Sequence, residues 1–344
     1  MTSLGAATSS PRPVAAGIEA GGTKFVCAIG TGPDDVVDSV VVPTTTPRET
    51  LARVRAFFDA PRQDVRVQRA GIASFGPLDL RPTSPTYGRI TTTPKPGWAG
   101  TDLLGSVRSW FEVPTRLDTD VNGAAYGEHC WGAARDVDSS AYLTVGTGVG
   151  GGAVVHGRVL GGQLHPEMGH LHVTRHPDDD FAGSCPFHGD CLEGLASGPA
   201  IRARTGRAAH DLGDQVDHVV ALEAWYLAQL VTAVALVVAP ERVVIGGGVL
   251  GLPGLLPAIR RGVLDRLDGA LDGTPVAEDV DAYLVAPQLG SMSGVLGAIA
   301  MTRPDAPAPS PRTDASPGGG FTAAYDGVPA TLNGALGRVD HRLG

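Results

Sequence analysis

The 344-residue chain has few aromatic residues, few cysteines and no excess of positive charge. Aromatic residues make up 5% of it, and 27 Lys and Arg stand against 36 Asp and Glu, for a formal net charge of −9. Nucleic-acid-binding proteins usually present basic patches and stacking aromatic side chains. The composition therefore argues against nucleic acid as a partner.

Long hydrophobic runs are also missing. The most apolar segment, 221–240, contains Glu223 and Gln229, and its uninterrupted apolar part is too short to cross a bilayer. The first residues show neither the positive segment nor the apolar run of a signal peptide. Four cysteines in so long a chain are typical of a reducing compartment. We therefore expect a cytoplasmic protein with no membrane partner.

Glycine, by contrast, is abundant, with 48 residues. Hydrophobic patterning predicts strands and helices in alternation, which indicates an α/β architecture. A strand, a glycine-rich turn and a second strand occur at 14–29 and again at 141–155. This similarity favours two α/β domains that face each other across a cleft.

The expected organisation follows from these patterns. Proline, glycine and small polar residues dominate both ends, and such a composition buries too little apolar surface to become ordered. We expect a flexible tail at 1–13, a smaller domain at 14–122 completed by a helix at 290–302, a larger domain at 123–289 with a zinc-binding segment, and a flexible tail at 303–344.

Three glycine-rich turns lie at predicted strand ends, at 21–24, 146–151 and 246–248. Successive backbone N–H groups in such a turn can cradle an anion, and glycine lets phosphate approach closely. Each turn alone fits an ordinary hairpin, but three together favour phosphate binding. They match neither the P-loop pattern nor the dinucleotide-binding fingerprint.

A carboxylate-rich segment, 118–122, joins a predicted strand to a predicted helix. A carboxylate at the carboxyl end of a strand lies where α/β proteins bind their ligands, and it can accept a proton as a general base. Asp120 or Asn122 could equally serve as the N-cap of the helix.

The pattern Cys185-x2-His188-x2-Cys191 places three good zinc ligands within seven residues. Four such ligands would form a closed, structural site. Three histidines could supply the fourth ligand: His165, His170 and His172. A disulfide between the two cysteines is the alternative, which a reducing compartment disfavours.

Together these motifs resemble the ROK family (repressors, open reading frames and sugar kinases), in particular its bacterial fructokinase branch. The resemblance spans about residues 14–302 and rests on 17–24, 74–78, 118–122, 146–151, 167–170 and the cysteine cluster. It implies an actin-like, ribonuclease-H-like ATPase fold of two domains, ATP in the cleft, and a homodimer.

The resemblance also assigns roles to individual residues. It makes Asp120 the catalytic base and His170 both a zinc ligand, with Cys185, His188 and Cys191, and a sugar contact. Further sugar contacts would be Glu167, Glu193 and Asn122, and Glu19 would orient Mg²⁺. The expected ATP-binding residues are Gly21, Gly22, Thr23, Lys24, Gly146, Thr147, Gly148, Gly150, Gly247 and Gly248.

Three departures from the wider family pattern bear on the substrate: Glu19 in place of Asp, Thr119 in place of Asn, and two cysteines with one histidine in place of three cysteines. All three resemble the fructokinase branch. The expected activity is ATP-dependent phosphorylation of D-fructose to fructose 6-phosphate. Glucose, mannose and N-acetylhexosamines are the alternative sugars, and a sugar-responsive repressor is the less favoured class.

Overall fold

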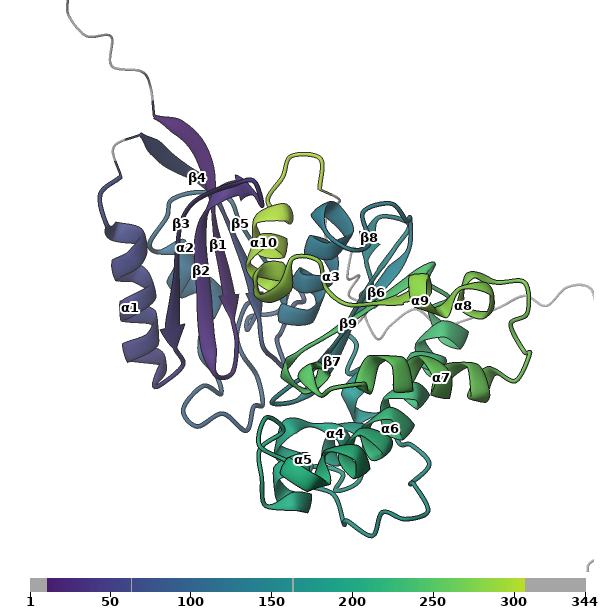
Figure 1. Cartoon of the computed structure of the whole chain (residues 1–344). Helices are drawn as coiled ribbons and strands as arrows, with labels where there is room; N and C mark the ends of the chain where they lie inside the picture. Colours follow the sequence, from purple (N-terminus) through teal and green to yellow (C-terminus); the bar gives the residue numbers. More distant parts are fainter. Residues whose placement is uncertain (1–10, 63, 163, 307–344) are drawn as a thin grey trace, which may run out of the picture. The chain divides into compact units, whose positions relative to one another are not determined.

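The computed structural model describes residues 11–62, 64–162 and 164–306, so most of both expected tails lies outside the described residues. These residues form one compact unit that contains two five-stranded sheets (Figure 1). The first sheet has the order β3 (Asp35–Pro43), β2 (Lys24–Gly32), β1 (Arg12–Ala20), β4 (Val65–Ser74) and β5 (Thr115–Thr119). The second has the order β8 (Arg158–Val159), β7 (Val149–Val155), β6 (Ser140–Val145), β9 (Arg242–Gly246) and β10 (Leu284–Val285).

The two sheets share one topology. In each, the first three strands form an antiparallel meander, the first strand also pairs in parallel with the fourth, and the fourth pairs in parallel with the fifth. The strand–turn–strand similarity in the sequence thus corresponds to the centre of each sheet. The parallel strands place the carboxyl ends of β1, β4 and β5 at one edge of the first sheet, where the site residues lie.

Ten helices lie between or after these strands in the described chain. They are α1 (Pro47–Asp59), α2 (Leu103–Arg108), α3 (Asp120–Trp131), α4 (Leu192–Ala196), α5 (Gly198–Thr205), α6 (Val216–Val237), α7 (Leu255–Leu267), α8 (Pro275–Glu278), α9 (Val280–Tyr283) and α10 (Ser293–Ala300).

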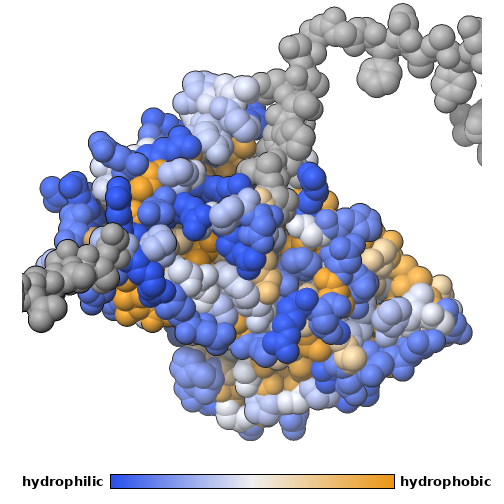
Figure 2. All heavy atoms as spheres, turned by 90° about the horizontal axis from the view of Figure 1, so that it is seen from above, coloured by the Kyte–Doolittle hydropathy of each residue, from blue (hydrophilic) through white to orange (hydrophobic). Residues whose placement is uncertain are grey.

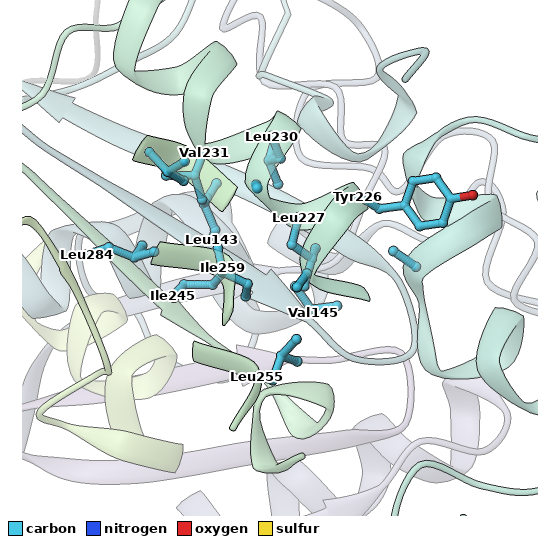
Figure 3. Close-up of a cluster of buried hydrophobic side chains, with 14 of the residues drawn as sticks. Leu143, Val145, Tyr226, Leu227, Leu230, Val231, Ile245, Leu255, Ile259 and Leu284 are labelled. Carbon is cyan, nitrogen blue, oxygen red and sulfur yellow. The ribbon is translucent and has the colours of Figure 1, made fainter. Parts of the chain in front are cut away.

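Each sheet has its own hydrophobic core. In the second, side chains of β6 and β9 pack against α6 and α7, and Figure 3 shows Leu143, Ile245 and Leu227 in this cluster. The Tyr226 ring lies at the side of the cluster with its hydroxyl turned away (Figure 3). In the first, Ile18 and Ile72 pack with residues of α1 and α2.

Helices α3 and α10 pack together between the two sheets (Figure 1). Their crossing is unusually close, because a methyl group on Gly297 of α10 would overlap the carbonyl oxygen of Gly123 in α3. Likewise, a methyl group on Gly127 would lie 2.5 Å from the carbonyl oxygen of Ser293. The two backbones therefore touch directly, and α10 also covers β1, β2 and β4.

The helix α6, with 22 residues, is long and apolar enough as a whole to cross a membrane, although Glu223 and Gln229 interrupt its apolar sequence. Most of it is buried in the core of the second sheet, Glu223 included. On the face shown in Figure 2, hydrophilic side chains predominate and hydrophobic ones form small groups.

The expected boundaries need three corrections. Arg12 and Pro13 belong to β1, where they pair with β4, so the ordered chain begins before residue 14. The boundary at 122/123 falls inside α3, which is one continuous helix. At the other end, Ala306 is buried and the Arg303 guanidinium stacks over the Trp131 ring, so the tail does not begin at 303.

Candidate active site

Asp120 is the first residue of α3, directly after β5. The cap of this helix is Thr119, whose hydroxyl accepts the N–H of Asn122 at 3.2 Å. Since Thr119 is the cap, Asp120 is not needed for capping, although its Oδ1 accepts the N–H of Val121 at 2.9 Å. Burial raises the pKa of Asp120 to about 6. The carboxylate is ionised at neutral pH and basic enough to take a proton.

Four carboxylates, those of Glu19, Asp120, Glu167 and Glu193, share this region, and burial together with neighbouring negative charge perturbs the protonation of Glu19 and Glu167. Burial, followed by the charge of Asp120, raises the pKa of Glu19 to about 7, and Lys24 opposes this rise. Burial raises the pKa of Glu167 to about 7 as well, with further contributions from Glu193 and Asp120. Such a concentration of negative charge favours binding of a cation.

Glu19 is suited to such a cation. Its Oε2 is buried and has no hydrogen-bond partner among the described residues. An unpaired buried carboxylate oxygen is costly unless a cation or a proton neutralises it. Oxygen donors are also what Mg²⁺ prefers. Glu19 therefore fits the Mg²⁺-orienting role that the resemblance implies.

The first two glycine turns meet across the two sheets. The Thr23 and Thr147 hydroxyls lie 3.4 Å apart, and Thr23 and Lys24 are exposed. The carbonyl oxygen of Gly146 accepts the N–H of Gly198 at the start of α5. Gly22 faces open space, so a phosphate can approach its backbone. The predicted phosphate-binding turns thus lie together.

The third turn borders a pocket of about 470 Å³ that Gly248, His210 and Val216 help to line. Gly247 has φ +98°, and a methyl group there would meet the backbone of Val145. Only glycine fits this position without strain. The turn therefore forms a fixed wall beside a cavity large enough for a nucleobase.

Two predicted ligand contacts occupy other positions. Gly150 lies in β7 rather than in the turn, which ends at Gly148, and a methyl group on it would press on Val121 of α3. Its placement in the phosphate-binding turn is therefore wrong. Asn122 has no exposed surface, and its amide nitrogen donates to Asp118 at 2.8 Å. It supports the turn between β5 and α3, and its sugar contact stays a prediction.

The four predicted zinc ligands come together: one ligand atom from each of His170, Cys185, His188 and Cys191 lies within 4.8 Å of the others. The Cys185 sulfur lies 3.8 Å from Nδ1 of both histidines, and the Cys191 sulfur lies 3.6 Å from Nδ1 of His170. Tetrahedral zinc separates sulfur and nitrogen ligands by about 3.6 Å. The geometry therefore fits zinc, and both cysteines are free thiols.

The segment before Cys185 has a second attachment that the sequence does not reveal. Asp179 is buried and accepts hydrogen bonds from Arg204 of α5, at 2.9 and 3.2 Å, and from the Tyr226 hydroxyl, at 2.7 Å. The Arg204 guanidinium also lies over the Phe181 ring. A buried, doubly bonded ion pair of this kind fixes a loop firmly once it is formed.

The other predicted sugar contacts border the zinc cluster. Glu193 is the second residue of α4, two residues after Cys191, and its Oε2 accepts the N–H of Val149 at 3.0 Å. Glu167 precedes the 3-10 helix Met168–His170, and half of its side chain is exposed. His165, considered above only as a rival zinc ligand, contacts Glu167 and does not belong to the zinc cluster.

Comparison with known proteins agrees with this geometry. A model of the ROK family matches residues 15–304. The protein belongs to the ROK family. It is 45% identical over 285 residues to a putative fructokinase of Bacillus subtilis (strain 168), covering 83% of this chain and 94% of the relative. A fructokinase of Pediococcus pentosaceus is 43% identical over 286 residues, covering 83% and 96%.

Among solved structures, a ROK hexokinase from Thermus thermophilus superposes with a TM-score of 0.66 at 30% identity, covering 84% of this chain and 97% of that one. The actin-like α/β fold that the resemblance implied is therefore confirmed.

Proposed function

We propose that this member of the ROK family is an ATP-dependent hexose kinase that converts D-fructose to fructose 6-phosphate. The observation that carries the proposal is the identity of 41–45% to four proteins named as fructokinases, over 83% of the chain. The site supports it, because a general base, two facing phosphate-binding turns and a nucleobase-sized pocket border one region.

In this reaction Asp120 accepts the proton of the attacking sugar hydroxyl. The amides of the turns at 21–24 and 146–148 and the Lys24 ammonium hold the transferring phosphate, whose displacement depends mainly on position and charge. Mg²⁺ bound with ATP would supply charge neutralisation, and Glu19 would hold it. Glu167, His170 and Glu193 would orient the sugar.

A coupled assay of ADP release tests the substrate. Fructose, glucose, mannose and N-acetylmannosamine are compared at equal concentrations, each with ATP and with polyphosphate as donor. We expect the highest kcat/KM with fructose and ATP. A higher value for another hexose would assign the chain to one of the alternative sugars. No turnover with any sugar would instead favour the sugar-responsive repressor.

We further propose that the site formed by His170, Cys185, His188 and Cys191 binds one zinc ion. Zinc would join the segment of His170 to that of Glu193 and so hold two sugar contacts together. With Nδ1 of His170 directed to zinc, its Nε2 stays available for a sugar hydroxyl.

Cys191→Ser should therefore lower bound zinc from about one ion per chain towards zero, as measured by elemental analysis. The KM for fructose should rise at least about tenfold, with less change for ATP. Cys130→Ser, at a free cysteine outside the cluster, is the matched control. Because Asp179 and Arg204 anchor the preceding segment, the variant should still fold. A disulfide between Cys185 and Cys191 in freshly lysed cells would contradict the zinc site.

The homodimer implied by the resemblance and the cytoplasmic location expected from the cysteine content remain proposals. Light scattering of the purified chain and cell fractionation test them directly.

A further inference from the structure

The side chain of His165 connects the two halves of the site. It is only 6% exposed, and its Nε2 accepts the N–H of Leu78 at 3.2 Å. On the other edge of the ring, Nδ1 lies 3.3 Å from Oε1 of Glu167. Leu78 follows β4 of the first sheet, whereas Glu167 precedes the 3-10 helix beside the second. The His165 imidazole thus links the backbone at Leu78, beside the first sheet, to the Glu167 carboxylate, beside the second.

This arrangement fixes the tautomer of the ring. A nitrogen that accepts a hydrogen bond carries no proton, so in a neutral imidazole the proton resides on the other nitrogen. Since Nε2 accepts the Leu78 N–H, Nδ1 carries the proton and faces the Glu167 carboxylate. The Nδ1 proton is therefore presented to Oε1 of Glu167, 3.3 Å away.

A proton donor beside Glu167 matters because the surroundings of this carboxylate disfavour its ionised form. Burial and the charges of Glu193 and Asp120 all raise its pKa. A donor at Oε1 favours the ionised form and fixes the plane of the carboxylate. Half of the Glu167 side chain is exposed, so the other oxygen can reach a ligand.

We propose that His165 is a positioning residue for the acceptor sugar, which holds the ionised Glu167 carboxylate so that its Oε2 accepts hydrogen bonds from sugar hydroxyls. The inference rests on the proposed function, because it gives Glu167 a sugar to bind. It also makes the orientation of Glu167 depend on the backbone at Leu78.

Two substitutions separate the two contacts of the ring. The amide of His165→Asn can place a donor near the position of Nδ1, but it is too short to reach Leu78. The amide of His165→Gln reaches the position of Nε2 and can accept the Leu78 N–H, but it lacks a donor near Glu167. Melting temperatures of both variants control for general loss of folding.

With fructose as substrate, we expect His165→Gln to raise KM by about 10–100-fold, the usual cost of a hydrogen bond to a charged group. His165→Asn should keep KM within about threefold of the wild type, and KM for ATP should change little in both. Equal KM values in both variants, whether normal or impaired, would overturn the proposal.

The ring itself gives a readout that does not need activity. In ¹⁵N-labelled wild type, the His165 imidazole should show a protonated Nδ1 and an unprotonated Nε2, and Glu167→Gln should shift the Nδ1 signal. A ring protonated on Nε2 would overturn the proposal even if fructose is phosphorylated. Absence of phosphorylation with the predicted tautomer present would instead count against the proposed function.

Discussion

Asp120 combines the position of a helix start with the chemistry of a partly buried carboxylate. Thr119 caps α3, so an amide at position 120 leaves the cap intact. Asp120→Asn keeps the acceptor for the Val121 N–H but cannot take a proton. We expect kcat to fall by roughly 10²-fold or more with KM for ATP nearly unchanged. Asp102→Asn, at the cap of α2, is the matched control and should leave turnover unaltered. Near-wild-type turnover of Asp120→Asn would remove Asp120 from the mechanism.

The pKa of Asp120 also predicts a pH dependence. Burial raises this pKa from 3.8 to about 6, so the protonated, inactive form accumulates as the pH falls through 6. Because the reaction needs Asp120 in its deprotonated form, kcat/KM should decrease as the pH is lowered. It should be constant above about pH 7 and fall tenfold per pH unit well below 6. Initial rates between pH 5 and 8 measure this limb. A limb centred near pH 4 would show that Asp120 is not buried in the working enzyme.

At the scale of the element, the crossing of α3 and α10 fixes the base against the first sheet. It depends on backbone contact, because Gly297 lies directly on the Gly123 carbonyl. Gly297→Ala should destabilise the protein by about 1–3 kcal/mol, the usual cost of overpacking. Gly162→Ala, where a methyl group meets open space, is the control. Denaturant unfolding gives the free energy of unfolding of each variant. Equal values for Gly297→Ala and Gly162→Ala would show that α3 and α10 can move apart at little cost.

Single elements differ in how far the sequence predicts them. The β1–β2 and β6–β7 hairpins are predicted, because in each a glycine-rich turn separates two apolar runs. β3 is not predicted, since this edge strand is mostly exposed and lacks alternation. Nor is α7, in which Pro257 and Gly262 are poor helix formers. The zinc ligands at 185–191 are predicted because they are close in sequence. His165 and Leu78 are 87 residues apart, and only folding brings them together.

At the scale of the whole molecule, two truncations test how much residues 303–306 contribute to stability. Removing 307–344 should leave stability and activity nearly unchanged, because proline, glycine and small residues dominate that stretch. Removing 303–344 also deletes the buried Ala306 and the contact of Arg303 with Trp131. The longer deletion should therefore lower the free energy of unfolding by about 1–2 kcal/mol. Thermal melts that coincide for both truncations would contradict this difference.

The close contact of α10 with β1 has a consequence for synthesis on the ribosome. Gly17 lies against Val295, so one face of the first sheet stays uncovered until almost the whole chain has been translated. At about 5–20 residues per second, the nascent β1 waits roughly 14–55 s for its covering helix. During that time its apolar face would be open to other apolar surfaces, including those of chaperones. Codon choice and growth temperature, which set the rate of translation, should therefore affect the yield of folded protein. This effect should be larger than expected from the free energy of unfolding alone.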